Sequence, residues 1–341
     1  MRPLPLILAL ATLPHCASAP NLPASDHFNG SVFYNDPPAE HMGALAMARH
    51  VMFGRSSNWP GEMRPVGQQE ARALKADTIR ITFINHATLL IEFGQVAILT
   101  DPVWSTRVGP YAWAGPRRAT EPGIAFEQLP RITAVVISHN HFDHLDLPTL
   151  RRLKTAFDPQ FIVPLAVADL IHGEVSPRVT ELDWWQSFSG AGYKVVMTPA
   201  RHNSRRGLFD QDKTLWASYA IFADKTHFVY FAGDTAYGGH FREIRQRLGS
   251  PVAALLPIGA YEPNEIMRHA HVNPAEAVRA HRDLASPLSI AMHFGTFNLT
   301  AEDIDSPAKD LLNASENAKL KSGEFVVLRE GDYRDIRTKE K

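Results

Sequence analysis

The feature that most constrains this chain is a group of potential metal ligands within six residues: His139, His141, Asp143 and His144. The group directly follows the apolar, β-branched run 132–137, which predicts a buried strand. Residues 147–153 have helical spacing, so the ligands are predicted in a strand-to-helix loop. Side chains alternate along an extended chain, so His139 and His141 can bind one ion, and the two later ligands can turn toward a second position. Imidazole nitrogens with a carboxylate favour Zn²⁺ over Mg²⁺ or Ca²⁺.

Further candidate ligands each stand just after a predicted strand: His202, Asp234 and His293. Loops at one edge of a sheet converge in space, so ligands far apart in sequence can meet there. His86 lies in a turn between two predicted strands and has no partner at ligand spacing. A structural role, or a role behind the ligands, is therefore favoured for His86 over metal binding.

Composition narrows the function without naming it. The 341 residues are 45% hydrophobic, which is enough for one large domain or two modest ones. The chain carries 35 basic and 36 acidic side chains and has no cluster of Lys and Arg with interleaved aromatic residues, which argues against nucleic acid as a partner. The single cysteine, Cys16, lies near the N-terminus, so metal binding must rest on His and Asp.

The first nineteen residues have the pattern of an export signal. Arg2 precedes the apolar segment 4–13, and Ala17-Ser18-Ala19 offers a cleavage site. A lipoprotein leader attached through Cys16 is the alternative, although Pro14-His15 match such a signal poorly. The pattern predicts an exported protein that is periplasmic or membrane-associated.

Three further regions are predicted. Residues 20–75 form an N-terminal arm that wraps the domain, with a helix at 44–55 that either packs on the core or contacts a membrane. Residues 76–331 form the compact hydrolase domain, and 332–341 are a charged tail. The aromatic segment 104–124 is either a loop that covers the substrate or a structural excursion.

The central motif and the later ligands resemble the metallo-β-lactamase superfamily. The resemblance implies an α/β fold, the αβ/βα four-layer sandwich, and two Zn²⁺ per chain, with iron or manganese as alternatives. It also implies that His139, His141 and His202 hold the first ion. Asp143, His144 and His293 would hold the second ion, and the Asp234 carboxylate would bridge the two.

Longer matches resemble the branch that contains N-acylphosphatidylethanolamine-hydrolysing phospholipase D. They lie at 233–237, 257–263, 271–278 and 293–296. The resemblance implies attack by a metal-bridging hydroxide that Asp143 orients, with release of N-acylethanolamine and phosphatidic acid. His271 would contact the substrate phosphate or protonate the leaving group, and Tyr261 is a candidate substrate-binding residue.

The partners that this resemblance implies are a phospholipid or another small phosphodiester as substrate, and a membrane that the protein contacts peripherally. A hydrolase of a lactone, ester or amide is the alternative, because such a metal site attacks carbonyl and phosphoryl centres alike. A metal-binding protein without catalysis is disfavoured, because seven ligands for two ions leave open coordination positions.

Overall fold

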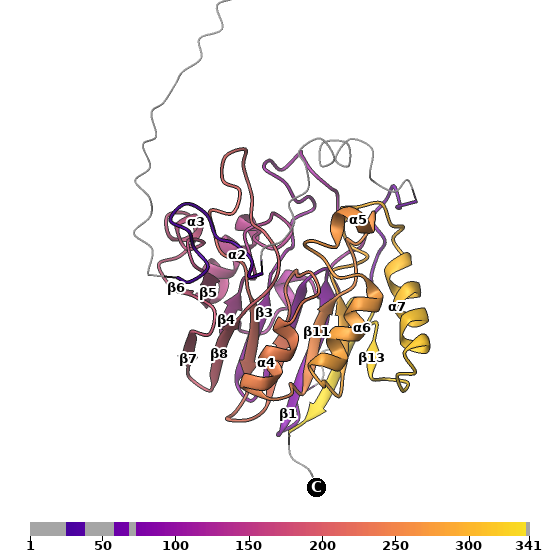
Figure 1. Cartoon of the computed structure of the whole chain (residues 1–341). Coiled ribbons are helices and arrows are strands. Elements are labelled where there is room, and N and C mark those ends of the chain that lie inside the picture. The colour runs from indigo at the N-terminus through magenta and orange to yellow at the C-terminus, as the bar shows by residue number, and fades with distance from the viewer. Residues whose placement is uncertain (1–24, 38–57, 68–72, 339–341) are drawn as a thin grey trace, which may run out of the picture.

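The computed structural model describes residues 25–37, 58–67 and 73–338 (Figure 1). The predicted export signal, Cys16 and the predicted helix at 44–55 lie outside these residues. No helix of the described residues is long and apolar enough to cross a bilayer.

The first sheet draws on both ends of the described chain. Its strands β1, β2 and β3 form an antiparallel meander, and the strands from β3 to β6 run parallel. Across the sheet, the order is β14 (Tyr333–Arg337), β1 (Thr78–Asn85), β2 (Thr88–Phe93), β3 (Val96–Thr100), β4 (Ala134–Val136), β5 (Gln160–Pro164) and β6 (Val179–Leu182).

Strand β14 corrects the prediction of a charged tail from residue 332. It pairs antiparallel with β1, and Arg80 Nε of β1 donates to Asp335 Oδ1 at 2.7 Å. Edge strands often carry charged side chains, because one side of the strand faces solvent. The charges that indicated a tail are therefore those of an edge strand.

The second sheet faces the first. Strands β7 to β10 are antiparallel, and β10 to β13 are parallel. Across the sheet, the order is β13 (Phe325–Val326), β12 (Ser289–Met292), β11 (Ala253–Pro257), β10 (Phe228–Phe231), β9 (Ser218–Phe222), β8 (Tyr193–Thr198) and β7 (Ser187–Gly190).

The main core lies between the sheets. The alternation in β1 places Ile79, Ile81 and Phe83 in this core, as the sequence predicts, against side chains of the second sheet such as Tyr219 and Phe231. Each fully buried side chain of this size contributes about 1.5–3 kcal/mol to folding.

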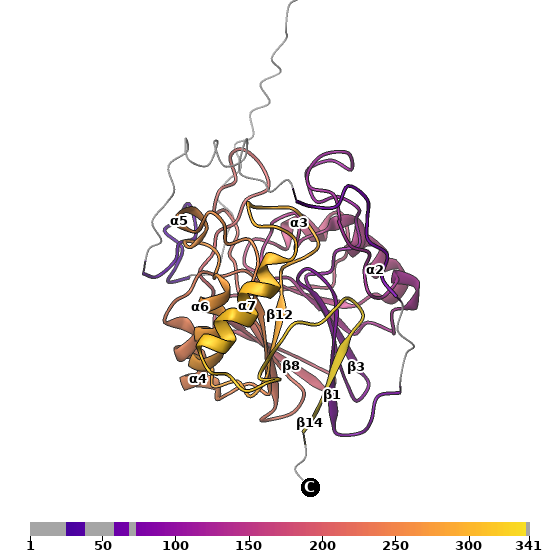
Figure 2. The ribbon, with the colours of Figure 1, turned by 90° about the vertical axis from the view of Figure 1, so that its right-hand side faces the viewer.

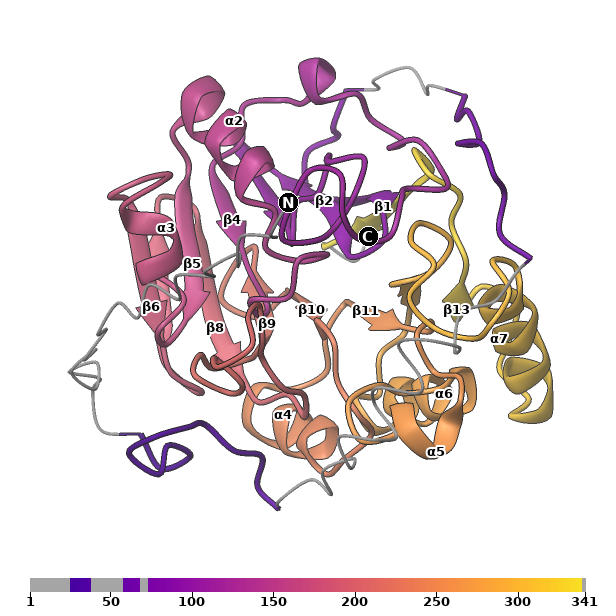
Figure 3. The ribbon, with the colours of Figure 1, turned by 90° about the horizontal axis from the view of Figure 1, so that it is seen from above.

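Helices cover the outer faces, which confirms the predicted four-layer sandwich (Figures 2 and 3). Leu150 and Leu153 of α2 pack on the first sheet, and Val278 of α6 and Leu311 of α7 pack in a cluster outside the second. Asn273 accepts a hydrogen bond from Glu276 N and caps α6, as predicted. Within the residues that the structure describes, the helices are η1 (Phe126–Gln128), α2 (Leu147–Phe157), α3 (Asp169–His172), α4 (His240–Leu248), α5 (Asn264–Met267), α6 (Pro274–Asp283) and α7 (Ser306–Asn317).

Candidate metal centre

The predicted ligands come from loops that follow β4, β8, β10 and β12. The loop after β4 carries the four ligands of the central motif and leads into α2, as the sequence predicts. His202 and Asp234 follow β8 and β10 after short connections, and His293 directly follows β12. The structure therefore brings all the predicted ligands to one place between the sheet edges.

In the first ligand group, three imidazole nitrogens face one another. His141 Nδ1 lies 2.8 Å from His139 Nε2 and 3.2 Å from His202 Nε2. His202 Nδ1 donates to the Ala270 carbonyl at 2.8 Å. Ser138 Oγ donates to Asp101, so it accepts from His139 Nδ1 at 2.8 Å. Both Nε2 atoms therefore present lone pairs, as neutral imidazoles that bind a metal do.

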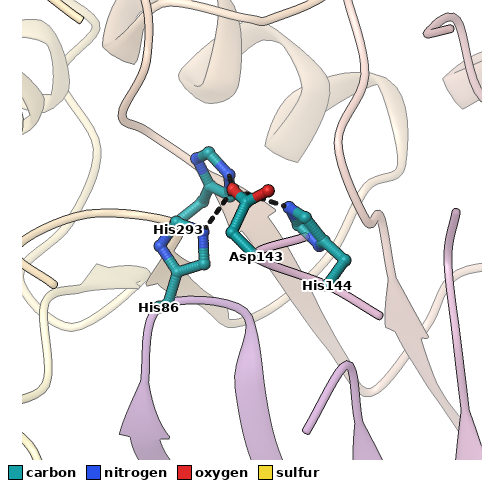
Figure 4. A group of neighbouring side chains, drawn as sticks. All are labelled: His86, Asp143, His144 and His293. Carbon is teal, nitrogen blue, oxygen red and sulfur yellow. Dashed lines mark hydrogen bonds and ion pairs between the residues drawn. The ribbon is translucent and has the colours of Figure 1, made fainter. Parts of the chain in front are cut away.

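The second group surrounds the Asp143 carboxylate, as Figure 4 shows. Asp143 Oδ2 lies 3.5 Å from His144 Nε2 and 3.6 Å from His293 Nε2. The same oxygen accepts a hydrogen bond from His86 Nε2 at 3.0 Å. This contact makes His86 a member of the site. It lies behind Asp143, and its nitrogen is also close enough to the group to serve as a ligand.

Asp234 stands between the two groups. Its Oδ2 lies 3.1 Å from His144 Nε2 and 3.0 Å from His293 Nε2 in the second group. The same oxygen is 3.9 Å from His202 Nε2 in the first group. The predicted bridging residue is thus the carboxylate that reaches both groups.

Several buried polar atoms of the site make no hydrogen bond: His144 Nε2, His293 Nε2 and Asp234 Oδ1. Buried polar atoms are normally paired, and an unpaired one costs about 1–3 kcal/mol. Coordination to a cation would satisfy Asp234 Oδ1 and, once the two imidazoles release their protons, His144 Nε2 and His293 Nε2 as well. The nitrogen and oxygen donors therefore fit a transition-metal centre, and the individual ligand roles stay predictions.

Asp101, at the end of β3, holds the central motif from behind. Its Oδ2 accepts from His144 Nδ1 at 2.6 Å, and its Oδ1 accepts from Ser138 N at 2.7 Å. A carboxylate on the far nitrogen of an imidazole fixes the ring and leaves the other nitrogen for a metal. No ligand spacing in the sequence predicts this role for Asp101. The Asp101-Pro102 pair at a strand end was the available signal.

Backbone geometry also shapes the site. His86 has φ 44°, Asp101 has φ 33° and His293 has φ 59°, all in the left-handed region that disfavours residues with a Cβ. Gly233, just before Asp234, has φ 58°, and a Cβ there would stand 2.6 Å from Ser138 Cβ. Only glycine fits where the loop after β10 meets the central motif.

The two groups differ in protonation. In the first group, burial lowers the pKa of His139 and His202, and it lowers the pKa of His141 to about 3. In the second group, burial also opposes charge, but the Asp234 and Asp143 carboxylates outweigh it. They raise the pKa of His293 to about 9 and hold the pKa of His144 well above its usual value.

His271 lies beside the candidate ligands. Its Nδ1 is 3.8 Å from Asp234 Oδ2, and its ring centroid is 5.1 Å from that of His202. Burial lowers the pKa of His271 well below its usual value, and Asp234 offsets this only in part. The imidazole is therefore neutral near pH 7 and can donate a hydrogen bond, but it holds no extra proton to give away.

Tyr261 does not join this group. It is 5% exposed, and its hydroxyl donates to the Asp310 carboxylate in α7. The hydroxyl is thus engaged in the packing of α7, which does not support the predicted substrate contact. Substrate contact by Tyr261 stays a prediction.

The chain is similar to proteins of a known family and fold. Residues 97–294 match the family described as beta-lactamase superfamily domain. An uncharacterized protein of Mycobacterium tuberculosis is 39% identical over 275 residues, 79% of this chain and 72% of that protein. The N-acyl-phosphatidylethanolamine-hydrolyzing phospholipase D 1 of Caenorhabditis elegans is 36% identical over 267 residues, 74% of each chain. A metallo hydrolase from Ignicoccus hospitalis shares the fold, with TM-score 0.57 and 23% identity over 77% of this chain and 100% of that one.

Proposed function

Because the chain belongs to the metallo-β-lactamase superfamily of metal-dependent hydrolases, we propose that it is a binuclear zinc phosphodiesterase of phospholipase D type. Its substrate is N-acylphosphatidylethanolamine or a similar phospholipid, which it splits into N-acylethanolamine and phosphatidic acid. The observation that supports two ions is the position of Asp234 Oδ2, 3.0–3.9 Å from imidazoles of both ligand groups. The likeness to the nematode phospholipase supports the choice of substrate.

Each ligand group would bind one of the two ions. His139, His141 and His202 would hold the first ion. Asp143, His144 and His293 would hold the second. Asp234, within reach of both groups, would contribute to both ions. When bound, two such ions would lower the pKa of a coordinated water toward 7 and would offset the charge that develops on the phosphoryl oxygens. The donors also accept iron or manganese, so metal analysis of protein purified without added metal decides the identity.

Side chains around the ions position the reactants. His86 donates to Asp143 Oδ2, which leaves the second lone pair of that oxygen for a metal ion and the other carboxylate oxygen to orient a water molecule. His271 is neutral and lies beside Asp234, where its N–H can donate to a substrate oxygen. This arrangement favours phosphate contact over leaving-group protonation for His271.

A substrate panel tests the proposal. The purified chain is assayed on an N-acylated phosphatidylethanolamine, bis-p-nitrophenyl phosphate, a lactone and a β-lactam, with a chelator-treated sample as control. We expect the two phosphodiesters to be hydrolysed and the chelator to abolish turnover. If the lactone alone is turned over, the proposed chemistry is wrong and the lactone, ester or amide alternative holds.

We also propose that the chain is exported, from the pattern in residues 1–19. Intact-mass spectrometry of the protein from its native membrane and periplasmic fractions should give an N-terminus near Ala19 or Pro20. A mass that corresponds to a lipidated Cys16 would indicate the anchored form. A mass that retains Met1 or Arg2 would contradict export.

A further inference from the structure

Exposed apolar side chains concentrate on two loops, 104–118 and 203–213, called the rim loops below. Six large hydrophobic side chains are exposed among the described residues, and the rim loops carry four of them. Tyr111 and Trp113 are 62% and 77% exposed, and Leu208 and Phe209 are 79% and 91% exposed. Single exposed apolar residues are ordinary, but such a concentration marks an interaction surface.

Each loop holds its apolar residues outward by local contacts. The Tyr111 and Trp113 rings stack, with centroids 5.4 Å apart and planes 2° from parallel. In the other loop, Gly207 N donates to Asp210 Oδ1 at 2.7 Å, which closes a turn around Leu208 and Phe209. The exposure is therefore built into defined turns.

Both loops are anchored to the segment that carries the metal ligands. Arg206 Nη1 donates to the carbonyls of Asn140 and Leu145 at 2.8 and 2.9 Å, and its guanidinium lies 3.9 Å from the centroid of the Phe142 ring. Ser105 Oγ donates to Asp146 Oδ1 at 2.8 Å. A surface that binds through the rim loops therefore lies next to the metal centre.

The rim loops meet over one cavity and project in one direction. A cavity of about 600 Å³ is lined by Val108, Pro110 and Tyr111 from one loop and by Arg206 from the other, with Phe142 between them. Figures 1 and 2 draw both loops at the same end of the sandwich, at the top of the ribbon. Their apolar tips can thus contact one surface together.

The chemistry of the tips fits a lipid surface. Tryptophan and tyrosine favour the interface between headgroups and acyl chains, because one part of each ring is apolar and another part forms hydrogen bonds. Arg107, Arg117 and Arg205 lie within the same loops, and Arg117 and Arg205 are exposed. Their apolar stems can lie along lipid while the guanidinium groups meet phosphate.

We propose that the rim loops dock the protein on a phospholipid bilayer that contains anionic lipid, with Tyr111, Trp113, Leu208 and Phe209 inserted at the headgroup level. Docking brings the candidate metal centre next to the bilayer surface, so that a lipid headgroup can enter the site. The proposal rests on the proposed function, because a phospholipid substrate requires such access. It places membrane contact on residues other than the helix predicted at 44–55.

Vesicle binding tests the proposal without hydrolysis. The full-length chain is sedimented with vesicles of phosphatidylcholine and phosphatidylglycerol, and with vesicles of phosphatidylcholine alone. We expect binding that is stronger with the anionic lipid. The double variant Trp113→Ser, Phe209→Ser should lose at least about tenfold in vesicle affinity, with unchanged metal content and melting temperature. The matched control is Leu312→Ser, because Leu312 is 59% exposed on α7, outside the rim loops, and should not change binding.

A label reads insertion directly and does not depend on the double variant. In a Cys16→Ser background, Phe209→Cys carries an environment-sensitive fluorophore, and Leu312→Cys serves as control. We expect vesicles to shift the emission of the label at position 209 to the blue and to leave that at 312 unchanged. Equal shifts, or binding that survives the double variant, would overturn the proposal.

Two outcomes separate this proposal from others. A dimer that the double variant abolishes, without vesicle binding, would assign the rim loops to contact between copies of the chain and overturn lipid docking. If the protein binds vesicles through the rim loops but hydrolyses no phosphodiester, docking is supported and only the proposed function is contradicted.

Discussion

Burial keeps the imidazoles of the first ligand group neutral, whereas two imidazoles of the second group are held as cations by Asp143 and Asp234. In the first group, nitrogen lone pairs already face one another, and each fixed ring donates its other N–H to a neighbouring oxygen. In the second, protons on His144 and His293 balance the two carboxylates. A metal ion in the first group would find nitrogen lone pairs in place, whereas one in the second group would have to displace protons.

Asp234 is the carboxylate that lies within reach of both groups, so its loss should have the largest effect. Asp234→Asn removes a charge that reaches both groups and should lower metal content to less than one ion per chain. Turnover should fall by about 10³ or more, because both halves of the centre are disturbed. Metal analysis after dialysis checks this. His202→Gln is the matched variant and should weaken the first ion only. Normal occupancy in Asp234→Asn would rule out the bridge.

The difference in protonation predicts a difference in pH dependence. His293 has a pKa of about 9, so a metal that binds the second group below pH 9 must release its proton, and that of His144. Affinity for the second ion should rise about tenfold per pH unit for each proton released, from pH 6 toward pH 9. The imidazoles of the first group are neutral over this range. Stepwise zinc titrations at pH 6, 7 and 8 give the two slopes, and equal slopes would contradict the comparison.

The same protonation affects stability without metal. The pKa of His293 is about 9 in the folded chain and about 6.5 when unfolded, because Asp234 and Asp143 outweigh burial. Its contribution to the free energy of unfolding is therefore fully present below about pH 6.5 and is lost as pH rises through 9. We expect the melting temperature of chelator-treated protein to fall over this interval. Metal-loaded protein is the control and should not show this fall.

His86 sharpens the comparison, because it touches only the second group. His86→Ala removes the hydrogen bond to Asp143 and should weaken the second ion by about 10–100-fold, with the first unchanged. His86→Gln can keep an N–H donor and should recover part of the loss. Competition titrations with a chromophoric chelator measure both constants. If the glutamine variant behaves like alanine, His86 acts as a ligand rather than as a donor to Asp143.

The smallest expected effect concerns His271, which lies beside Asp234. His271→Ala should keep both metals and lower turnover by roughly tenfold, the value of a hydrogen bond to a charged oxygen. The loss should be similar for bis-p-nitrophenyl phosphate and for a substrate with a poor leaving group. A loss confined to the poor leaving group would instead assign leaving-group protonation to His271.

Some of the ligands and strands can be predicted from the sequence and others cannot, for physical reasons. His139, His141, Asp143 and His144 are predictable because ligand types and strand periodicity coincide within one short segment. The contact between His86 and Asp143 joins residues 57 positions apart through a turn with positive φ, and no local spacing announces it. Composition alone does not separate a tail from an edge strand, so β14 was missed.

The pairing of β14 with β1 also has a consequence for the order of synthesis. Strand β1 is made early, but its partner at Tyr333–Arg337 leaves the ribosome some 250 residues later. Until then β1 has an unpaired edge, which is the kind of surface on which chains aggregate. A nascent chain of this protein therefore spends most of its translation with one sheet incomplete. When residues 333–337 are removed, a larger fraction of the overexpressed protein should be found in inclusion bodies.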